Sequence, residues 1–345
     1  MKNSGDFDSI LIASFGGPNC SEDVIPFLEN VLRGRNVPRA RLEAVAEHYY
    51  HFGGKSPINE QNLALIEALK AILETKGPNL PIYFGNRNWN PLFSETLLQM
   101  KRDGRKNALT FFTSVFSSYS GCRQYRENLA LAQAEIGDTA IKISKLRMPY
   151  NHPSFIGVMR ERVGEIVNSF SSQERSSSAI IYTAHSIPSG MAQCCNYERH
   201  FKEASNLVSE AFSDIPHKLA YQSRSGSPHQ PWLEPDISEV ITSCKEEGVT
   251  SVIVVPIGFV SDHMEVLYDL DLEAKLHAEN LGLAFYRAGT AGTHPLFVDM
   301  IRELIIERIE RRSTRAALGE YGPSHDICPL DCCLPGDNRP LLPSI

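Results

Sequence analysis

The sequence predicts an α/β protein built from two doubly wound lobes, each around a parallel sheet. Short apolar runs alternate with longer amphipathic stretches along the 345 residues, which is typical of strand–helix–strand units. Most of the apolar runs are hydrophobic at consecutive positions, as in strands buried on both faces. Four expected strands precede residue 150 and four follow it. A pair of similar four-stranded lobes is therefore the simplest arrangement.

Each lobe is expected to contain four strands with helices between them. The expected strands are Ser9–Phe15, Leu80–Asn86, Ala108–Phe116, Ala140–Leu146, Ala179–Ala184, Lys218–Gln222, Ser251–Phe259 and Leu283–Ala288. The clearest helical patterns cover Asn62–Thr75, Phe155–Asn168, Glu198–Phe212 and Phe297–Arg312. The polar run Ser171–Ser178 predicts a surface loop, and the periodicity fades after about Ser313.

Three segments are expected along the chain: a first lobe over 1–150, a second lobe over 151–321, and a cysteine-containing tail over 322–345. The length suits two domains, at roughly 150 residues each. The chain is 42% hydrophobic and 22% charged. This composition excludes a disordered or fibrous protein.

Charge and hydropathy limit the partners. The net charge of −7 argues against nucleic acid, because a phosphate-binding surface normally shows a basic excess. The longest strongly apolar run, Ser251–Val260, is about half of the roughly 20 residues needed to span a bilayer. The first residues lack the pattern of a secretory leader. We therefore expect a cytoplasmic protein without a membrane span.

No nucleotide-binding motif follows a predicted strand. Gly54-Lys55-Ser56 resembles the end of a phosphate-binding P-loop, but the first glycine of that motif would fall at Tyr49 and no strand precedes it. A G-x-G-x-x-G after a strand is also absent from the sequence. We therefore expect no nucleotide cofactor.

His185 ends an apolar run, and Pro188 soon afterwards prevents simple continuation of a central strand. In open parallel sheets, functional residues gather beyond the carboxyl ends of the strands. An imidazole there can exchange a proton near neutral pH or ligate a metal ion. From position alone, this interpretation and that of a hydrogen-bonded histidine terminating the strand are equally supported.

Glu265 follows another strong strand. Asp262 and Glu265 have the spacing of a capping box, which alone would explain them. Asp269 and Glu273 follow at i+4 and i+8, so three carboxylates are expected on one helix face, where like charges repel. Such a row of oxygen ligands suits the passage of a divalent cation toward His185. The competing interpretation is a solvated acidic face.

The eight cysteines fall into two sets. Three of them, Cys328, Cys332 and Cys333, lie within six positions of the tail, which favours a metal site. Structural zinc and iron–sulfur clusters both normally take four ligands. Cys122, beyond a strand end, is one candidate for the fourth ligand, and His325, which would favour zinc, is another. The remaining cysteines are scattered and are interpreted as structural or incidental: Cys20, Cys194, Cys195 and Cys244.

Aromatic and basic residues gather early in the chain, from Arg33 to the run His48-Tyr49-Tyr50-His51-Phe52. Aromatic faces together with arginine suit a flat anionic ligand. An amphipathic helix that ends at a glycine C-cap explains the same run without a ligand.

Taken together, these segments resemble the ferrochelatase family, whose members insert ferrous iron into a porphyrin. The matching segments, in order, are Ser14–Pro18, Phe52–Asn59, Thr183–Pro188, Tyr221–Gly226, Pro231–Pro235 and Gly258–Asp269. They extend over nearly the whole chain, and their order and spacing are specific. The sequence is most similar to the actinobacterial branch, which implies coproporphyrin III rather than protoporphyrin IX as substrate. The resemblance also implies two Rossmann-like lobes that flank a porphyrin cleft, with the chain's end crossing back between them.

The resemblance carries over to individual positions. His185 and Glu265 match the paired catalytic and metal-site residues, Ser56 and Tyr125 match porphyrin contacts, and Asp269 and Glu273 match an acidic row behind the metal site. Fe2+ is then a substrate. The resemblance also implies transient contacts with the haem-pathway enzymes upstream and downstream.

Two features differ from other members of the family: the residue at position 15 and the spacing of the tail cysteines. Phe15 stands where some members have a tyrosine that ligates iron in the product; phenylalanine cannot ligate, and we expect it to pack on the macrocycle. Cys122 lies where some members have a cluster ligand distant from a C-terminal trio. We therefore hypothesise a [2Fe–2S] cluster on Cys122, Cys328, Cys332 and Cys333, with a C-x3-C-C spacing unlike that of other branches.

The implied reaction exchanges two pyrrole N–H protons for Fe2+, without a redox change or a nucleotide. Binding that bends the flat ring would expose its nitrogens. Residue type does not decide whether His185 or Glu265 is the base and which one carries the metal. Two other classes remain open: a sensor that binds haem or an iron–sulfur cluster, and a chelatase for protoporphyrin IX, another tetrapyrrole or another metal.

Overall fold

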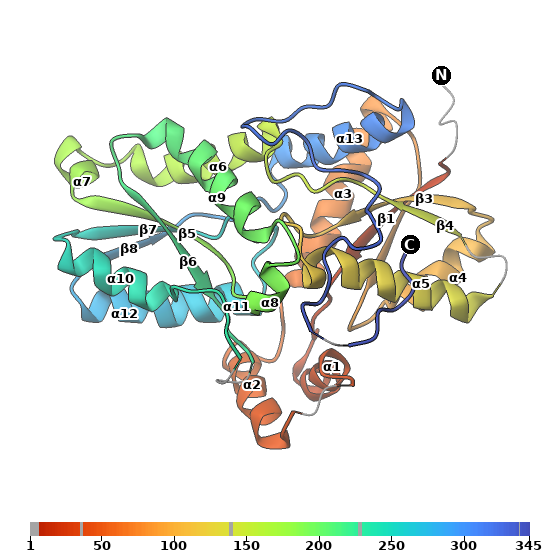
Figure 1. Cartoon of the computed structure of the whole chain (residues 1–345), viewed down its shortest axis with the longest axis horizontal. Coiled ribbons are helices and arrows are strands. Elements are labelled where there is room, and N and C mark those ends of the chain that lie inside the picture. Colours follow the sequence, from red (N-terminus) through yellow and green to blue (C-terminus); the bar gives the residue numbers. More distant parts are fainter. Residues whose placement is uncertain (1–6, 35–36, 138–140, 227–229, 338) are drawn as a thin grey trace.

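The computed structural model describes residues 7–34, 37–137, 141–226, 230–337 and 339–345, and it consists of two lobes that lie side by side (Figure 1). The first sheet has the order β2-β1-β3-β4, from β1 (Ser9–Ser14), β2 (Ile82–Asn86), β3 (Asn107–Phe112) and β4 (Lys142–Lys145). The second has the order β6-β5-β7-β8, from β5 (Ser178–His185), β6 (His217–Gln222), β7 (Ser251–Val255) and β8 (Ala284–Arg287). All six strand pairings are parallel. The predicted fold class is confirmed.

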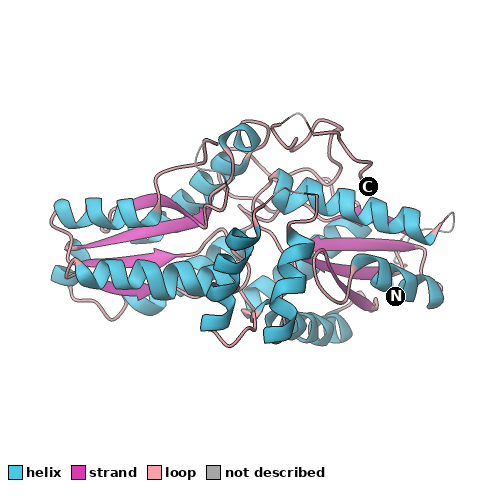
Figure 2. Cartoon of the chain, turned by 90° about the horizontal axis from the view of Figure 1, so that it is seen from below, coloured by secondary structure: helices cyan, strands magenta, loops and turns pink. Residues whose placement is uncertain are grey.

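Helices lie above and below each sheet (Figure 2), which explains why the central strands are apolar at consecutive positions. Every residue of β1 and β7 is buried. The first half contains η1 (Ser21–Asp23), α1 (Val24–Val31), α2 (Arg39–His51), α3 (Ile58–Lys76), α4 (Phe93–Arg102), the π-helix η2 (Tyr119–Arg123) and α5 (Gln124–Ile136). The second half contains α6 (Pro153–Val167), α7 (Ser172–Ser176), α8 (Ser189–Ala192), α9 (Tyr197–Ser209), η3 (Glu210–Phe212), α10 (Ile237–Glu246), α11 (Met264–Val266), the π-helix η4 (Leu267–Ala274), α12 (Lys275–Asn280) and α13 (Pro295–Ile309).

The observed strands lie where the sequence predicts them, but some of their boundaries differ. The strand expected to reach Phe259 ends at Val255, because Pro256 follows and has no N–H to pair. The surface loop expected over Ser171–Ser178 is wrong. The helix α7 occupies that segment, and it begins with a capping box in which Ser171 and Glu174 bond each other's backbone N–H groups. Ala140, expected at the start of a strand, lies outside the described residues.

The helix α13 joins the two lobes, although it follows the second sheet in sequence. It packs against both α3 and α6, and one core cluster includes Leu69 of α3, Ile301 of α13 and residues of both sheets. At its end, Glu307 forms a buried ion pair with Arg147, which follows β4, with Arg147 Nε 2.8 Å from Glu307 Oε2. The lobes therefore share one interior.

The segment after α13 crosses back between the lobes (Figure 1). Asn151 Nδ2 donates to the carbonyl oxygens of Leu318 and Gly322, both at 2.9 Å. Farther along, Gly336 lies against Gly190 of α8 so closely that a Cβ on Gly336 would stand 2.2 Å from the Gly190 carbonyl carbon. This segment thus contacts the connection between the two sheets and the helix that follows His185. Among the described residues, no helix has the length and apolar character that a membrane crossing needs.

Candidate active site

His185 and Glu265 come together beyond the carboxyl ends of the second sheet. His185 is the last residue of β5, opposite Gln222 of β6 in the strand register. Glu265 lies in α11, which the chain reaches after β7. His185 Nε2 is 3.5 Å from Glu265 Oε2, and the two side chains are 30% and 45% exposed. The two residues are therefore in contact and accessible to a ligand.

The capping-box interpretation of Glu265 is wrong. The residue that caps α11 is His263, whose Nδ1 accepts the N–H of Glu265 at 3.2 Å. Asp262, the predicted cap, instead pairs with Arg287, with Arg287 Nη1 3.0 Å from Asp262 Oδ1. The Glu265 carboxylate therefore does not bond a helix terminus, and it faces His185.

The charges of this pair stabilise each other. Burial disfavours the charged form of His185, but the Glu265 carboxylate outweighs it and raises the pKa of the imidazole to about 9. Burial also disfavours the charged form of Glu265. The attraction of His185 is larger than this effect and lowers the pKa of the Glu265 carboxyl group to about 2. His185 Nδ1 lies against the Ser186 carbonyl oxygen, which can only accept, so Nδ1 carries a proton. Nε2 is then the atom that can exchange a proton or a metal ion.

The acidic row continues along η4, where a π-helix replaces the expected α-helix. Asp269 accepts a hydrogen bond from the Ser223 hydroxyl. Burial and the neighbouring Glu265 charge raise the pKa of Asp269 to about 7. The pKa of Glu273 is also raised, by burial and by Asp236. The row therefore includes a carboxyl group that exchanges protons near neutral pH.

The helix α2 covers this region from the first lobe. The predicted amphipathic helix is confirmed over Arg39–His51, and Gly53 and Gly54 follow it with φ of 73° and 74°, backbone angles that favour glycine. His48 stacks on Tyr268 of η4, with ring centroids 3.8 Å apart and 5° between the planes. The aromatic run thus reaches across to the acidic row.

Ser56 and Tyr125 lie in the first lobe. Ser56 is 3% exposed, and its N–H donates to the Pro18 carbonyl oxygen at 2.9 Å. Tyr125 is 4% exposed, and the Arg87 guanidinium lies 4.9 Å from its ring centroid and 5.5 Å from that of Phe15. Phe15 also meets Phe27 edge-on. Arg87 therefore links the two aromatic rings at the carboxyl edge of the first sheet.

The structure gathers the tail cysteines and both candidates for a fourth ligand. The donor atoms of His325, Cys328 and Cys332 all lie within 4.8 Å of one another. Cys332 Sγ is 3.5 Å from both His325 Nε2 and Cys333 Sγ. The buried Cys122 thiol of η2 forms a hydrogen bond with Cys328, and such bonds from Cys122 and Cys332 hold the pKa of Cys328 far below that of an ordinary thiol.

Several residues of the site were not singled out from the sequence as candidates. His263 lies 3.9 Å from Glu265 Oε2 through its Nδ1, Ser223 bonds Asp269, and Arg87 joins Phe15 to Tyr125. His263 and Ser223 belong to segments that match the family, so the sequence indicated that these segments matter but did not assign a role to either residue. Arg87 follows a predicted strand end, a position that could have identified it.

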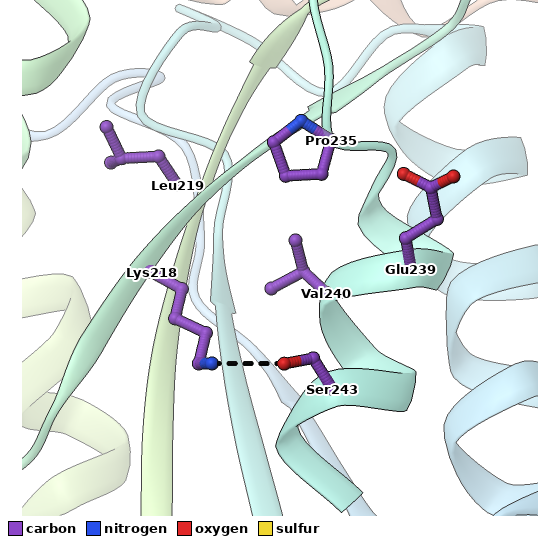
Figure 3. Close-up of a pocket in the computed structure, with 6 residues that line it drawn as sticks. All are labelled: Lys218, Leu219, Pro235, Glu239, Val240 and Ser243. Atoms are coloured by element: carbon purple, nitrogen blue, oxygen red, sulfur yellow. Dashed lines mark hydrogen bonds between the residues drawn. The ribbon is translucent and has the colours of Figure 1, made fainter. Parts of the chain in front are cut away.

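A cavity of about 500 Å³ lies elsewhere, between β6 and α10 (Figure 3). Lys218 Nζ donates to Ser243 Oγ across it at 3.3 Å. It adjoins the first residues of β6, at the opposite end of the strand from Gln222, which pairs with His185. Glu239, its third polar lining residue, accepts the Asp236 N–H, so its polar groups have partners within the protein and we assign it no part in the site. Its lining residues are Lys218, Leu219, Pro235, Glu239, Val240 and Ser243.

Solved structures with a similar fold come from another group of chelatases. SirB from Bacillus subtilis with Fe3+ matches with a TM-score of 0.54 and 14% identity, over 88% of this chain and 97% of that one. SirB from Bacillus subtilis subspecies spizizenii, described as a sirohydrochlorin chelatase in complex with cobalt, matches with a TM-score of 0.52 and 13% identity, over 90% and 98% of the chains. At these identities the likeness concerns the fold alone.

Sequence relatives are much closer. A protein named ferrochelatase from Rhodopirellula baltica is 52% identical over 99% of this chain and 97% of its own length. A protein named coproporphyrin III ferrochelatase from Streptomyces coelicolor is 45% identical over 98% and 96% of the two chains. The model of the Ferrochelatase family matches residues 8–309. A match of this extent, on a fold with the expected two lobes, shows that the chain belongs to the ferrochelatase family.

Proposed function

We propose that the protein inserts Fe2+ into coproporphyrin III, with His185 and Glu265 as the groups that exchange protons and hold the metal. The observation that carries the proposal is the contact of His185 Nε2 with Glu265 Oε2 at 3.5 Å, at the carboxyl end of β5. A nitrogen and an oxygen donor side by side can both ligate Fe2+ and accept pyrrole protons. Relatives in the same family that are named for coproporphyrin III support the choice of substrate.

The protonation states of His185 and Asp269 suit the exchange of pyrrole protons for Fe2+. Without metal, His185 is protonated and paired with Glu265, because its pKa is about 9. A divalent cation that binds Glu265 takes over the role of counter-charge and lowers the pKa of the imidazole, so Nε2 loses its proton. The neutral imidazole can then accept a pyrrole proton. Asp269, with a pKa of about 7, can pass that proton outward.

The first lobe supplies the surface for the porphyrin. From the family resemblance we assign Ser56 and Tyr125 to contacts with the ring and its substituents, and Phe15 to packing on the macrocycle. Ser56 and Tyr125 are only 3% and 4% exposed, so the porphyrin must displace the side chains that cover them. Arg87 fixes Phe15 and Tyr125 relative to each other. Contacts at the periphery can offset the strain of bending the ring, which exposes the pyrrole N–H groups to His185.

The product constrains the cellular context. Coproporphyrin III keeps all its propionates during insertion, so an enzyme that removes carboxyl groups from the iron-loaded ring must act afterwards. We propose cytoplasmic insertion with transient contacts to the enzymes before and after this step, because a porphyrin with several carboxylates is water-soluble.

We further propose that Cys122, Cys328, Cys332 and Cys333 hold a [2Fe–2S] cluster. Four thiols drawn from two distant segments meet in one place, and four thiolates are the usual ligand set of this cluster. When bound, such a cluster supplies one-electron exchange; the insertion reaction itself uses none. The proximity of His325 to Cys328 and Cys332 favours the alternative of a zinc ion.

The substrate is tested by one anaerobic assay. Purified protein and Fe2+ are mixed with coproporphyrin III or with protoporphyrin IX, and the loss of free-porphyrin fluorescence is followed. We expect rapid loss with coproporphyrin III and slow loss with protoporphyrin IX. The reverse preference would keep the chemistry and overturn the substrate. Absence of insertion with both porphyrins, by a folded protein, would favour a sensor or a different tetrapyrrole.

The cluster is tested separately by composition. Anaerobically purified protein is expected to contain equal amounts of iron and acid-labile sulfide, with a visible absorption band that reduction bleaches. Stoichiometric zinc without sulfide would overturn the cluster and leave the insertion assay unaffected.

A further inference from the structure

Three cationic side chains of the first lobe are buried beside the tail that carries the cysteines. Lys145 ends β4, Arg123 ends η2, and Arg126 lies in α5. They are 6%, 4% and 4% exposed. Lysine and arginine are seldom buried without a partner, so each of the three requires a local explanation.

The three side chains bond oxygen atoms of the tail. Lys145 Nζ donates to the His325 carbonyl oxygen at 2.9 Å. Arg123 Nη1 donates to the carbonyl oxygens of Leu330 and Cys332, at 2.6 and 3.1 Å. Arg126 Nε donates to the Ile345 backbone oxygen, at 2.9 Å. These contacts position the tail, but the neutral carbonyl oxygens that Lys145 and Arg123 bond balance no charge.

The counter-charges are incomplete. Arg123 pairs with the buried Glu127, with Arg123 Nε 2.9 Å from Glu127 Oε1. Lys145 has no carboxylate at ion-pair distance among the residues that the structure describes. The buried Arg126 Nη1 atom has no hydrogen-bond partner in that part of the chain either. An ammonium group removed from water without an anion carries a large desolvation penalty.

The anion that would balance Lys145 is available in the thiols. Lys145 Nζ bonds the His325 carbonyl oxygen, and the donor atoms of the His325, Cys328 and Cys332 side chains lie within 4.8 Å of one another, so the ammonium group is anchored at the cysteine cluster. Two ferric ions, two sulfides and four thiolates make a doubly negative group, and one electron makes it triply negative. A buried positive charge beside such a group stabilises the reduced form more than the oxidised form.

We propose that Lys145 is the counter-charge of the metal group held by the tail cysteines and that it raises the reduction potential of that group. This inference rests on the [2Fe–2S] cluster proposed above. Lys145 is a positioning and tuning residue, since it acts through the cysteines and touches neither porphyrin nor inserted iron. Its role is visible in the reduction potential, which a merely structural lysine would not change.

The test is a potentiometric titration of the full-length protein, followed by visible absorption. Lys145→Met removes the charge, Lys145→Gln keeps a donor for the His325 carbonyl oxygen, and Lys145→Arg keeps the charge. We expect the Met and Gln variants to lower the reduced-to-oxidised ratio at a fixed potential about tenfold or more, equivalent to about 59 mV for one electron. The Arg variant is expected to retain most of the wild-type potential. Lys142→Met is the matched control, because Lys142 lies on the same strand but is exposed, and its potential is expected to stay unchanged.

Each outcome bears on the proposal. A wild-type potential in the Gln variant would mean that Lys145 only holds the tail through the His325 carbonyl oxygen, and it would overturn the inference. If the Met and Gln variants assemble no cluster while the Arg variant does, the charge requirement is supported by iron and sulfide content. Loss of the cluster in all three variants, with a folded protein, would overturn it. If the wild type contains neither iron nor sulfide, the inference falls together with the cluster, and the insertion assay still decides the proposed activity.

Discussion

The contact of His185 with Glu265 combines two properties that a site for metal exchange needs. The pair is stable without metal, because the imidazolium and the carboxylate compensate each other. It is also only partly covered, at 30% and 45% exposure, so a cation can reach it. A divalent ion that replaces the proton meets donors already in place.

We expect Glu265→Gln to lower the pKa of His185. The neutral amide removes the charge that raises this pKa to about 9, and burial, which favours the neutral imidazole, remains. The His185 pKa then falls below that of the wild type, while the Ser186 carbonyl oxygen and Asp269 continue to favour the charged form. At pH 8 a smaller fraction of the imidazole is therefore charged in the variant than in the wild type.

The measurement is an NMR titration of the imidazole in the metal-free protein. Glu279→Gln is the control, since Glu279 is an exposed residue of α12. An unchanged titration midpoint for His185 in the Glu265→Gln variant would contradict the electrostatic account of the pair.

We expect His185→Ala to reduce iron insertion by at least about 100-fold, the lower range for loss of a general acid–base group. Porphyrin binding is expected to persist, because the proposed ring contacts, Ser56 and Tyr125, lie in the first lobe. Stopped-flow fluorescence measures insertion, and quenching of the bound porphyrin measures affinity. His217→Ala, at the opposite end of the neighbouring strand, is expected to behave as wild type. Turnover near the wild-type rate in the His185→Ala variant would refute the role of His185.

At the residue scale, their place after strands made His185 and Glu265 candidates, the family resemblance paired them, and the structure shows their side chains in contact. Nothing in the spacing D-H-M-E distinguishes a capping box from a histidine cap, because Asp262 and His263 both precede the helix. The choice depends on Arg287, which is more than 20 positions away and holds Asp262. Tyr125 was predicted only through the family resemblance, since its contact with Arg87 is not local in sequence.

At the element scale, two segments depart from regular patterns. Carboxylates at i, i+4 and i+8 fit an α-helix, and nothing in that periodicity indicates the π-helix η4. The short helix α7 could have been predicted, because Ser171 and Glu174 carry the S-x-x-E signature of a helix start. The tail required the structure, since Cys122 meets Cys328 from a position some 200 residues earlier.

We expect Gly336→Val to detach the tail from α8. Gly336 has a φ of 73°, and a Cβ there would stand 2.2 Å from the Gly190 carbonyl carbon, so backbone must move. Limited proteolysis is expected to cleave the variant after α13 several times faster than the wild type. Gly322→Val is the matched control: its φ is 66°, but nothing lies within 4 Å of its Cβ. Equal cleavage of the two variants would mean that backbone strain, rather than the contact with Gly190, explains the effect.

At the scale of the whole molecule, both lobes depend on one interior. The prediction of two four-stranded parallel lobes was correct because strands that are buried on both faces are apolar at consecutive positions, and this pattern is visible in the sequence. The expected domain boundaries remain a prediction. The joining role of α13 could not be derived, because its apolar face at Ile301, Leu304 and Ile305 does not specify which lobe covers it.

We expect Arg147→Met to reduce the free energy of unfolding by about 3–5 kcal/mol, because it leaves Glu307 buried without a partner. Removing both charges, in Arg147→Met with Glu307→Leu, is expected to recover much of that loss. Urea denaturation followed by circular dichroism measures both. Arg175→Met removes a surface pair with Asp214 and is expected to cost about 0–1 kcal/mol. An equal loss in the two single variants would contradict the importance of this join between the lobes.

The packing of α13 on α3 also bears on the order in which the protein is made. The first sheet is complete at Lys145, yet the helix that covers α3 begins at Pro295, 150 positions later (295 minus 145). At about 5–20 residues per second, translation of that interval takes roughly 8–30 s. During this time the apolar face around Leu69 and Leu73 has no α13 to cover it. A nascent chain paused within the second half therefore exposes apolar surface of α3 that the finished protein buries.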